Sequence, residues 1–203
     1  YFNNMNSSVA YIYGFLPTDF GRVSDAMMES ATDNSVYTWE NNSIYYITNG
    51  IWSPLKRVDD GWGFWDGVRS ANLFLENFDP KVLERFQYNE DYDEMIDKAS
   101  KFSLEVRFLR AFYLFELAKR YGDIPLITRT YTQEEINSVR KTSFADVIDF
   151  IAKECTEITR EGGLPEDGVR GETGRVTKGA ALALKSRALL YAASDLHNPA
   201  HDL

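Results

Sequence analysis

The segment from Phe102 to Thr128, FSLEVRFLRAFYLFELAKRYGDIPLIT, constrains this chain most, because it predicts one long helix with a defined end. At about 100° per residue, polar residues gather on two opposite sides and apolar residues fill both flanks. One polar side holds Ser103, Arg107 and Arg110, and the other holds Lys101, Glu105, Glu116, Lys119 and Arg120. Two apolar flanks need two neighbours, so we expect this helix inside a bundle or stacked array. Gly122 is the expected left-handed stop residue.

Other helices are indicated by apolar residues at helical spacing. These segments lie at 5–16, which stops before Pro17, and at 65–78, 143–161 and 177–194. Asp79-Pro80 is a cap and first-turn pair that opens a further short helix, and Ser143 and Thr177 are expected caps of the two later helices. A polar, acidic stretch at 89–98 precedes the long helix, which we expect to begin after it.

The segment 20–60 differs from the rest of the chain. It carries Gly, Asn, Ser, Thr and Asp among aromatic residues, without a sustained period. We therefore expect mostly loop there, with room for a short strand. The fold class predicted for the chain is all-α with long irregular loops.

A local repeat supports an array of helix pairs. The pattern Arg-Ala followed by an aromatic residue occurs at Arg110-Ala111 and again at Arg187-Ala188, 77 residues later. Tetratricopeptide-like arrays use about 34 residues per helix pair, so two pairs with loop insertions would give this displacement. The Trp-Leu-Gly-Tyr consensus of such repeats is absent from the sequence.

Two blocks carry a resemblance to a known family. The run from Leu109 to Ile127 resembles the signature helix of SusD/RagB-type proteins, the nutrient-binding lipoproteins of the Bacteroidetes outer membrane. The block from Gly174 to Asp195, GRVTKGAALALKSRALLYAASD, resembles the later signature helix of that family, and Ala31–Asn34 and Trp65–Leu75 are weaker matches. The resemblance implies a tetratricopeptide-like helical-repeat superhelix, the SusD-like fold.

The resemblance also implies a function. SusD-like proteins capture a glycan at the cell surface without cleaving it and deliver it to a SusC-like TonB-dependent transporter. Some relatives handle peptides or other nutrients, and a helical scaffold that binds only the transporter or another protein is the alternative from a different class. The resemblance implies a surface-exposed outer-membrane lipoprotein, whose lipid-modified Cys would lie before Tyr1, so its membrane contact would be the anchor alone.

Composition agrees with a neutral ligand. The chain has 22 basic and 31 acidic residues, a net charge of −9, and no cluster of five basic residues, which argues against nucleic acid and against anionic lipid surfaces. No apolar run reaches the roughly 18 to 20 residues of a membrane span. Aromatic residues make up 14% of the chain, which suits either a packed helical core or a sugar-stacking surface.

Catalytic, cofactor and metal motifs are weak in this sequence. Cys155 is the single cysteine and falls on the apolar stripe of its helix, so we expect a buried structural thiol. His197 and His201 stand four apart, but Pro199 between them disrupts a helical metal site. No sequence signal marks a raised-pKa acid beside a nucleophile, so an enzyme is the third hypothesis. We expect no cofactor and no metal.

Aromatic and polar residues that suit a sugar concentrate between 35 and 65. Flat rings cover the apolar face of a sugar, while amide, guanidinium and carboxylate groups bond its hydroxyls. The candidate glycan-binding residues are Trp39, Trp62, Tyr37, Tyr45, Asn41, Arg57 and Asp59. The competing interpretation is that these rings only hold a loop onto the helices, and we prefer it for Trp52 and Trp65.

The last helix bears on the extent of the protein. It is apolar on both flanks, like the long helix, and it is followed only by the short stretch SDLHNPAHDL. A terminal repeat normally presents a polar outer face. We therefore expect 1–203 to be one N-terminal helical-repeat region of a longer protein that continues after Leu203.

Overall fold

The computed structural model describes residues 1–18, 20–166 and 173–199. These residues form two compact units, which are described separately. Unit 1 comprises Tyr1–Phe15 and Gly63–Leu203, and unit 2 comprises Leu16–Trp62.

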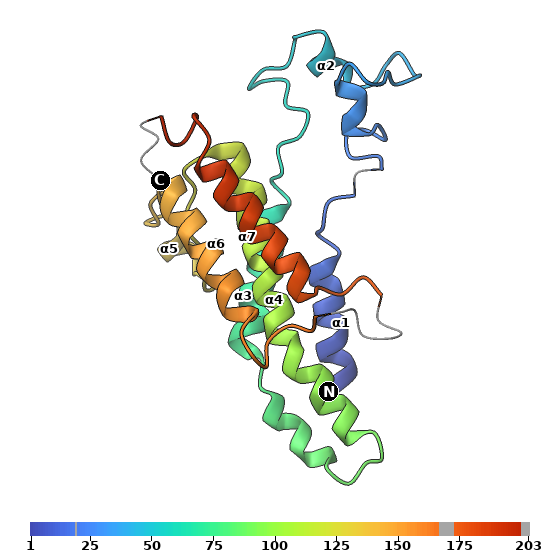
Figure 1. The fold of residues 1–203 in the computed structure, drawn as a ribbon, viewed down its shortest axis with the longest axis vertical. Coiled ribbons are helices and arrows are strands. Elements are labelled where there is room, and N and C mark those ends of the chain that lie inside the picture. Colours follow the sequence, from blue (N-terminus) through green and yellow to red (C-terminus); the bar gives the residue numbers. More distant parts are fainter. Residues whose placement is uncertain (19, 167–172, 200–203) are drawn as a thin grey trace. The chain divides into compact units, whose positions relative to one another are not determined.

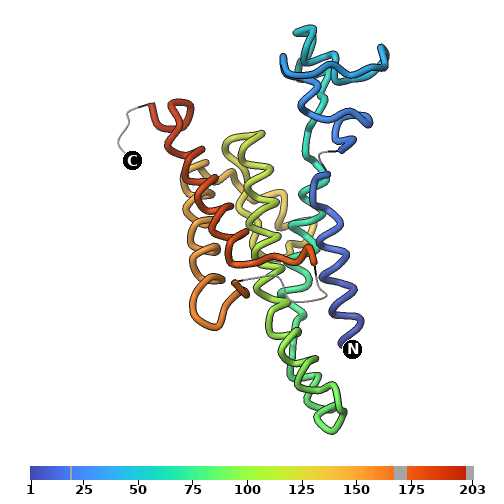
Figure 2. The backbone as a smooth tube through the Cα atoms, turned by 45° about the vertical axis from the view of Figure 1, so that its right-hand side comes forward, coloured from blue at the N-terminus to red at the C-terminus, as the bar shows by residue number. Residues whose placement is uncertain are grey.

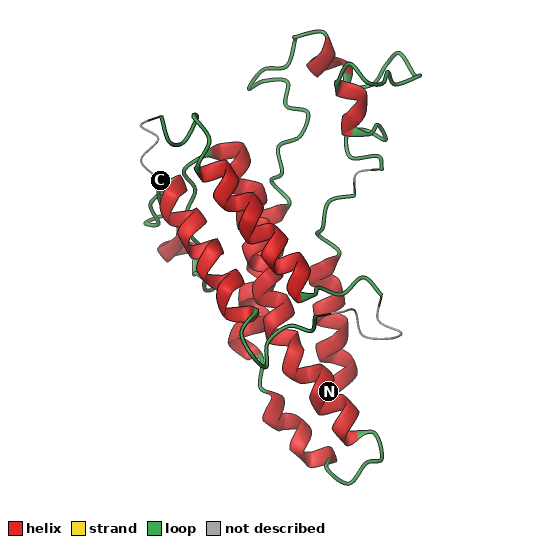
Figure 3. Cartoon of the chain, viewed as in Figure 1, coloured by secondary structure: helices red, strands yellow, loops and turns green. Residues whose placement is uncertain are grey.

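Helices are the regular elements of both units (Figures 1 and 3). Unit 1 contains α1 (Phe2–Tyr13), α3 (Phe64–Asn77), η2 (Pro80–Phe86), α4 (Tyr92–Tyr121), α5 (Gln133–Ile136), α6 (Phe144–Ile158) and α7 (Lys178–Ala192). Unit 2 contains η1 (Met28–Ala31) and α2 (Tyr45–Thr48). Extended pairing among residues 1–18, 20–166 and 173–199 is limited to isolated bridges such as Ile124 with Thr142. The all-α prediction is confirmed.

Helix α4 occupies the middle of unit 1. It packs against α1, α3 and η2 and also against α6 and α7, so both of its apolar flanks are covered. Phe102, Tyr113 and Phe115 are fully buried along it. The pairs α3/α4 and α6/α7 each lie side by side, as Figures 1 and 2 show from two directions. The predicted two-sided burial of the long helix and its arrangement in helix pairs are confirmed.

The helix ends follow the expected local chemistry. Asp79, Ser143 and Thr177 each accept a hydrogen bond from a backbone N–H two or three residues later, which satisfies a donor that the first turn leaves unpaired. Gly122 ends α4 at φ 68°, and its N–H donates to the Ala118 carbonyl at 2.8 Å. That left-handed conformation favours a residue without Cβ.

The start of α4 differs from the prediction. We expected the acidic stretch 89–98 to precede the helix, but the helix begins at Tyr92. Asp93 and Glu94 lie in its first turn, where negative charge complements the helix dipole. Ion pairs one turn apart, Glu94–Lys98 at 2.8 Å and Asp97–Lys101 at 2.6 Å, support the same segment. A prediction based on polarity alone therefore placed the start of the helix too late.

Helices α3 and α4 approach closely at a glycine. Gly67 faces the ring of Tyr113, and a Cβ at Gly67 would lie 2.7 Å from that ring. The Tyr113 ring also stacks on Phe64 at 5.9 Å between centroids, and its hydroxyl donates to the Ile12 carbonyl of α1. Tyr113 thus fixes α1, α3 and α4 around one buried ring.

A polar network joins α3, α4 and α6. Glu154 accepts two hydrogen bonds from Arg107, at 2.7 and 3.1 Å, and one from Arg110 at 3.1 Å. Arg110 also donates to Asn72 Oδ1 at 3.0 Å, and the Asn72 amide donates to the carbonyls of Ile127 and Arg129. Burial opposes ionisation of Glu154, but the hydrogen bonds and charges of the two arginines outweigh it and lower the pKa of that carboxyl.

A second polar cluster holds the segment that leads into α7. The Tyr13 hydroxyl donates to Glu105 Oε2 at 2.7 Å and accepts from the Val176 N–H at 2.9 Å. Arg175 pairs with Glu105 at 3.0 Å and donates to Asn6. Burial and the neighbouring Glu105 carboxylate raise the pKa of Tyr13, so the phenol stays protonated. The start of α7 is therefore fixed to α1 and α4.

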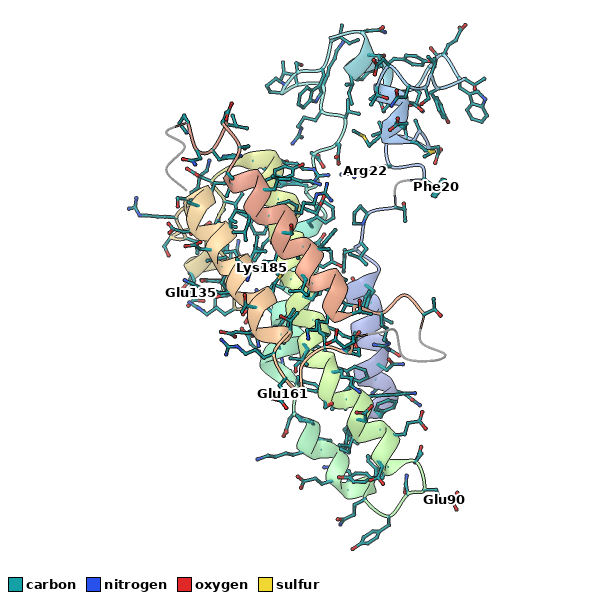
Figure 4. The ribbon with its side chains drawn as sticks, viewed as in Figure 1. Phe20, Arg22, Glu90, Glu135, Glu161 and Lys185 are labelled. Carbon is teal, nitrogen blue, oxygen red and sulfur yellow. The ribbon has the colours of Figure 1, made fainter. Side chains whose placement is uncertain are left out.

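Helix α7 has neighbours on one flank only among the described residues. Lys185, labelled in Figure 4, donates to the Thr156 hydroxyl of α6 at 2.9 Å, and the Tyr191 ring meets Phe115 of α4 edge to face. The other flank carries exposed leucines, with Leu190 71% exposed. The predicted second neighbour of this helix is not within the part of the chain that the structure describes.

The Gly67 contact makes a testable prediction. Gly67→Ala should lower the free energy of unfolding by about 1–3 kcal/mol, because the added methyl group must displace a buried ring. Gly179→Ala is the matched control, since a Cβ there would meet its nearest atom at an ordinary 3.7 Å. Urea denaturation of both variants measures the difference. Equal stability of the two would contradict the close approach of α3 and α4.

The Glu154 network predicts a dependence on pH. Because folding lowers the pKa of Glu154 below its ordinary value of 4.5, its stabilisation is present above that pH and is lost as pH falls through the folded-state pKa. Glu154→Gln should lower the free energy of unfolding by about 2 kcal/mol at pH 7. The difference in unfolding free energy between this variant and wild type should narrow below pH 4.5. Glu157 is half-exposed and pairs with the same Arg107, so Glu157→Gln should lower the free energy of unfolding by less than about 1 kcal/mol. Chemical denaturation between pH 3 and 7 tests both.

Candidate functional site

Unit 2 has a small core of its own. Val23, Ala26 and Ile44 are fully buried at its centre. Residues that pack partly buried against them are Met28, Ala31, Tyr37, Tyr45, Ile47 and Val58. The segment expected to be mostly loop is irregular as predicted (Figure 3), but its buried residues form a core.

A tight turn and one amide organise this core. Val23 and Ala26 exchange backbone hydrogen bonds at 3.0 and 2.9 Å, and Ser24 and Asp25 between them both have positive φ. Asn42 donates through its amide to the Ser24 carbonyl at 2.5 Å and accepts from the Ile44 N–H at 2.9 Å. The side chain of Asn42 therefore holds the strained turn against the start of α2.

Ion pairs fix the two ends of unit 2. Arg22, labelled in Figure 4, pairs with Asp59 at 2.9 Å, and both side chains are partly buried. Arg57 lies 3.9 Å from Asp60, which also accepts the Trp62 N–H at 3.1 Å. Of the predicted site residues, Asp59 therefore serves the fold of the unit, while the guanidinium of Arg57 remains largely exposed.

Three predicted aromatic residues lie together in unit 2. The Tyr45 hydroxyl donates to the Tyr37 carbonyl, and the Tyr37 ring contacts Trp39 at 6.3 Å between centroids with the planes 63° apart. Tyr37 and Tyr45 are half-buried against the core, whereas Trp39 is exposed. The two tyrosines thus position the loop that presents the Trp39 ring.

Three tryptophans of unit 2 are exposed to solvent. Trp39, Trp52 and Trp62 are 73%, 62% and 58% exposed. We expected Trp52 to be a structural ring, but its side chain is largely exposed, while its backbone N–H donates to the Tyr46 carbonyl at 2.8 Å. Trp65, also taken as structural, is half-buried in α3. The exposure of Trp52 could not be predicted from the sequence, because two successive N–H groups bonded to one carbonyl leave no sequence motif.

Polar groups accompany these rings. Asn41 is exposed next to the Trp39 loop, and Lys56 lies 5.5 Å above the Tyr46 ring. Rings, amides and a guanidinium on one small unit can cover the apolar face of a polyhydroxylated ligand and bond its hydroxyls. This is binding chemistry, which requires no activated nucleophile.

Cys155 and His197, the thiol and the imidazole considered for catalysis or metal binding, both lie in unit 1. Burial raises the pKa of the Cys155 thiol to about 12. The His197 ring stacks on Phe144 at 3.6 Å, and its predicted companion His201 lies outside the described residues. Residues 1–18, 20–166 and 173–199 contain no cluster of three His, Cys, Asp or Glu side chains with metal-ligand geometry.

The family follows from comparison with known proteins. A SusD-like family model, described as "Starch-binding associating with outer membrane", matches residues 19–190. This chain belongs to the SusD-like family. The match includes nearly all of unit 2 and helices α3 to α6 with most of α7. No curated protein matches the SusD-like chain.

Solved structures agree with this assignment. A SusD-like protein from Bacteroides fragilis is 29% identical, with a TM-score of 0.71, and the match covers 92% of this chain and 34% of that one. A SusD-like carbohydrate-binding protein from the same species is 26% identical, with a TM-score of 0.67 over 93% and 37%. A laminarin-binding SusD-like protein is 22% identical, with a TM-score of 0.71 over 98% and 42%, and supports the fold alone.

The chain is shorter than the solved structures that it matches. The SusD-like chain spans 34% to 42% of the length of these three solved structures. Within the described ranges, no helix combines the length and apolarity that crossing a membrane would require.

Proposed function

We propose that this SusD-like chain binds a glycan at the cell surface without cleaving it, and that unit 2 supplies part of the binding surface. The observation that carries the proposal is the exposure of three tryptophan side chains of unit 2, Trp39, Trp52 and Trp62. Large exposed rings present apolar surface to water. Stacking on the apolar face of a sugar removes that surface from water. The SusD-like carbohydrate-binding protein from Bacteroides fragilis and the starch-binding description of the family support this ligand class.

The predicted residues divide into two roles in this proposal. Trp39 and Trp62 stack on sugar rings, Asn41 and Arg57 bond sugar hydroxyls, and Trp52 joins the stacking residues. Tyr37, Tyr45 and Asp59 hold the surface in shape through the contacts described above. Affinity of such a shallow site should lie between about micromolar and millimolar, or about −8 to −4 kcal/mol.

Delivery and location complete the proposal. The bound oligosaccharide passes to a SusC-like TonB-dependent transporter, and the protein is a surface-exposed lipoprotein of the outer membrane, held by a lipid upstream of Tyr1. The family description, which mentions association with the outer membrane, supports this location. No cofactor or metal takes part.

A peptide ligand is the second candidate. Leu55 and Val36 of unit 2 are 96% and 80% exposed, and aliphatic side chains suit a peptide better than a sugar. Binding of short apolar peptides, with no response to any glycan, would favour this alternative.

We further propose that residues 1–203 form the N-terminal helical-repeat region of a longer protein. The exposed leucines of α7 support it, since a following helix would cover them, and so does the greater length of the solved relatives. The intact mass of the native protein should be more than twice the 23.3 kDa of this chain. A native mass near 23.3 kDa would refute the proposal.

Isothermal titration of the full-length protein against a panel of polysaccharides tests the binding surface. Trp39→Ala and Trp62→Ala should each weaken binding of the recognised glycan about tenfold, or about 1.4 kcal/mol, because each removes a stacking ring. Tyr88→Ala, which removes a 92% exposed ring from unit 1, is the control and should leave affinity unchanged. If both tryptophan variants bind like wild type, unit 2 is not the site.

A further inference from the structure

An asparagine followed by glycine stands at the end of the short helix α2, which is labelled in Figure 1. Asn49 is the one asparagine of this sequence that glycine follows. Both residues are exposed, and Gly50 adopts φ 67°. No described atom beyond its chain neighbours lies within 4 Å of the position that a Cβ of Gly50 would take. The Gly50 nitrogen is therefore unshielded beside a side-chain amide.

An Asn-Gly pair can react within itself. The Gly50 nitrogen loses its proton and bonds to the Asn49 Cγ, while the Cγ–Nδ2 bond breaks and Nδ2 leaves as ammonia with that proton. The product is a cyclic succinimide. Water then opens it at Cγ to give aspartate, or at the main-chain carbonyl carbon to give isoaspartate. Because glycine has no Cβ, its own side chain does not hinder the attack.

Hydrogen bonds restrain two other asparagine side chains of unit 2. The Asn34 amide donates to Glu29 Oε1 at 2.7 Å, and the Asn42 amide donates to the Ser24 carbonyl at 2.5 Å. Within the described ranges, the Asn49 side chain has no hydrogen-bond partner. Its Cγ can therefore rotate toward the Gly50 nitrogen without breaking a side-chain contact.

The backbone gives Asn49 some protection, and it gives Asn137 the same protection. The Gly50 N–H donates to the Ile47 carbonyl at 3.1 Å and must leave it before it reacts. Such a bond opens readily in an exposed helix of four residues.

Asn137 provides a matched comparison within the same chain. It is also exposed, and it ends α5, which is likewise a helix of four residues. The N–H of the next residue, Ser138, donates to the Glu135 carbonyl at 2.9 Å, as Gly50 does to Ile47. The two sites therefore share their backbone hydrogen bonding and differ in the residue that follows.

We infer that Asn49 is a site of spontaneous deamidation and isomerisation, while Asn137 stays largely intact over the same time. The side-chain freedom of Asn49 and the missing Cβ of Gly50 carry this inference together. Each product replaces a neutral amide by a carboxylate, so the chain gains negative charge at position 49.

The reaction also alters the surface proposed to bind glycan, a consequence that rests on the proposed function. The N–H groups of Ile51 and Trp52 both donate to the Tyr46 carbonyl, at 3.0 and 2.8 Å. Asn49 and Gly50 lie in the loop that these bonds close. Isoaspartate inserts a methylene group into the main chain of this loop, which displaces the exposed Trp52. The modified protein therefore binds the recognised glycan more weakly.

Peptide mass spectrometry of the full-length protein tests the modification. Samples are digested before and after prolonged incubation at neutral pH and physiological temperature, and fragment spectra locate each change. The peptide with Asn49 should gain the mass by which a carboxyl group exceeds an amide, and should separate into aspartate and isoaspartate forms. The peptide with Asn137 serves as the internal control. An intact Asn49, or equal conversion of Asn137, overturns the inference.

Exchanging the following residues tests the cause. Gly50→Ser should lower conversion of Asn49 to the level of Asn137, and Ser138→Gly should raise conversion of Asn137. Because serine at φ 67° is strained, thermal melts establish that Gly50→Ser is folded. Asn49→Gln, which keeps an amide on a longer side chain, should abolish the mass gain even if Gly50→Ser unfolds. Conversion that does not follow the glycine, or that persists in Asn49→Gln, overturns the inference.

Glycan titration tests the consequence for the binding surface. Anion exchange separates the deamidated protein by its added charge, and it should bind the recognised glycan several-fold more weakly than the intact fraction. Asn49→Gln stored in the same way should keep its affinity. Equal affinity of the two fractions would overturn the consequence for Trp52. Tryptophan variants without effect on glycan binding would refute the proposed function and leave the mass measurement unaffected.

Discussion

The burial of both flanks of α4 is the constraint on which unit 1 depends. A helix covered on two sides must also bury some of its polar residues, and Glu105, Arg110 and Glu116 are all buried. Each finds an ionic partner, at 2.6 to 3.1 Å. Glu116 pairs within α4, whereas Arg110 pairs with Glu154 of α6 and Glu105 pairs with Arg175 before α7. Because a buried charge without a partner is costly, the last two pairs help fix the neighbours of α4 and their register. The helix pairs of the array are thus selected by charge as well as by apolar shape.

Most of the helices could be predicted because their signals are local. Apolar spacing, the caps at Asp79, Ser143 and Thr177, and the stop at Gly122 depend only on near neighbours in sequence. The early start of α4 was missed, since acidic composition was taken for irregular structure. The short helix α5 was also missed, although Thr132 with Glu135 forms a capping box that its sequence could have indicated.

The candidate surface was harder to predict, because exposure in a loop depends on contacts between distant residues. The sequence identified an aromatic-rich segment. It did not indicate that the Tyr45 hydroxyl donates to the Tyr37 carbonyl or that Asp59 pairs with Arg22. Such contacts determine which side chains stabilise the fold of unit 2 and which remain exposed to solvent.

The burial of Cys155 has a practical consequence for studying this chain. A thiol whose pKa is raised to about 12 holds almost no thiolate at neutral pH, and alkylating reagents attack the thiolate. Cys155 is also the single cysteine of the sequence. A cysteine introduced at an exposed position would therefore be the reactive one, and a fluorophore or spin label could be attached there without first replacing the native residue.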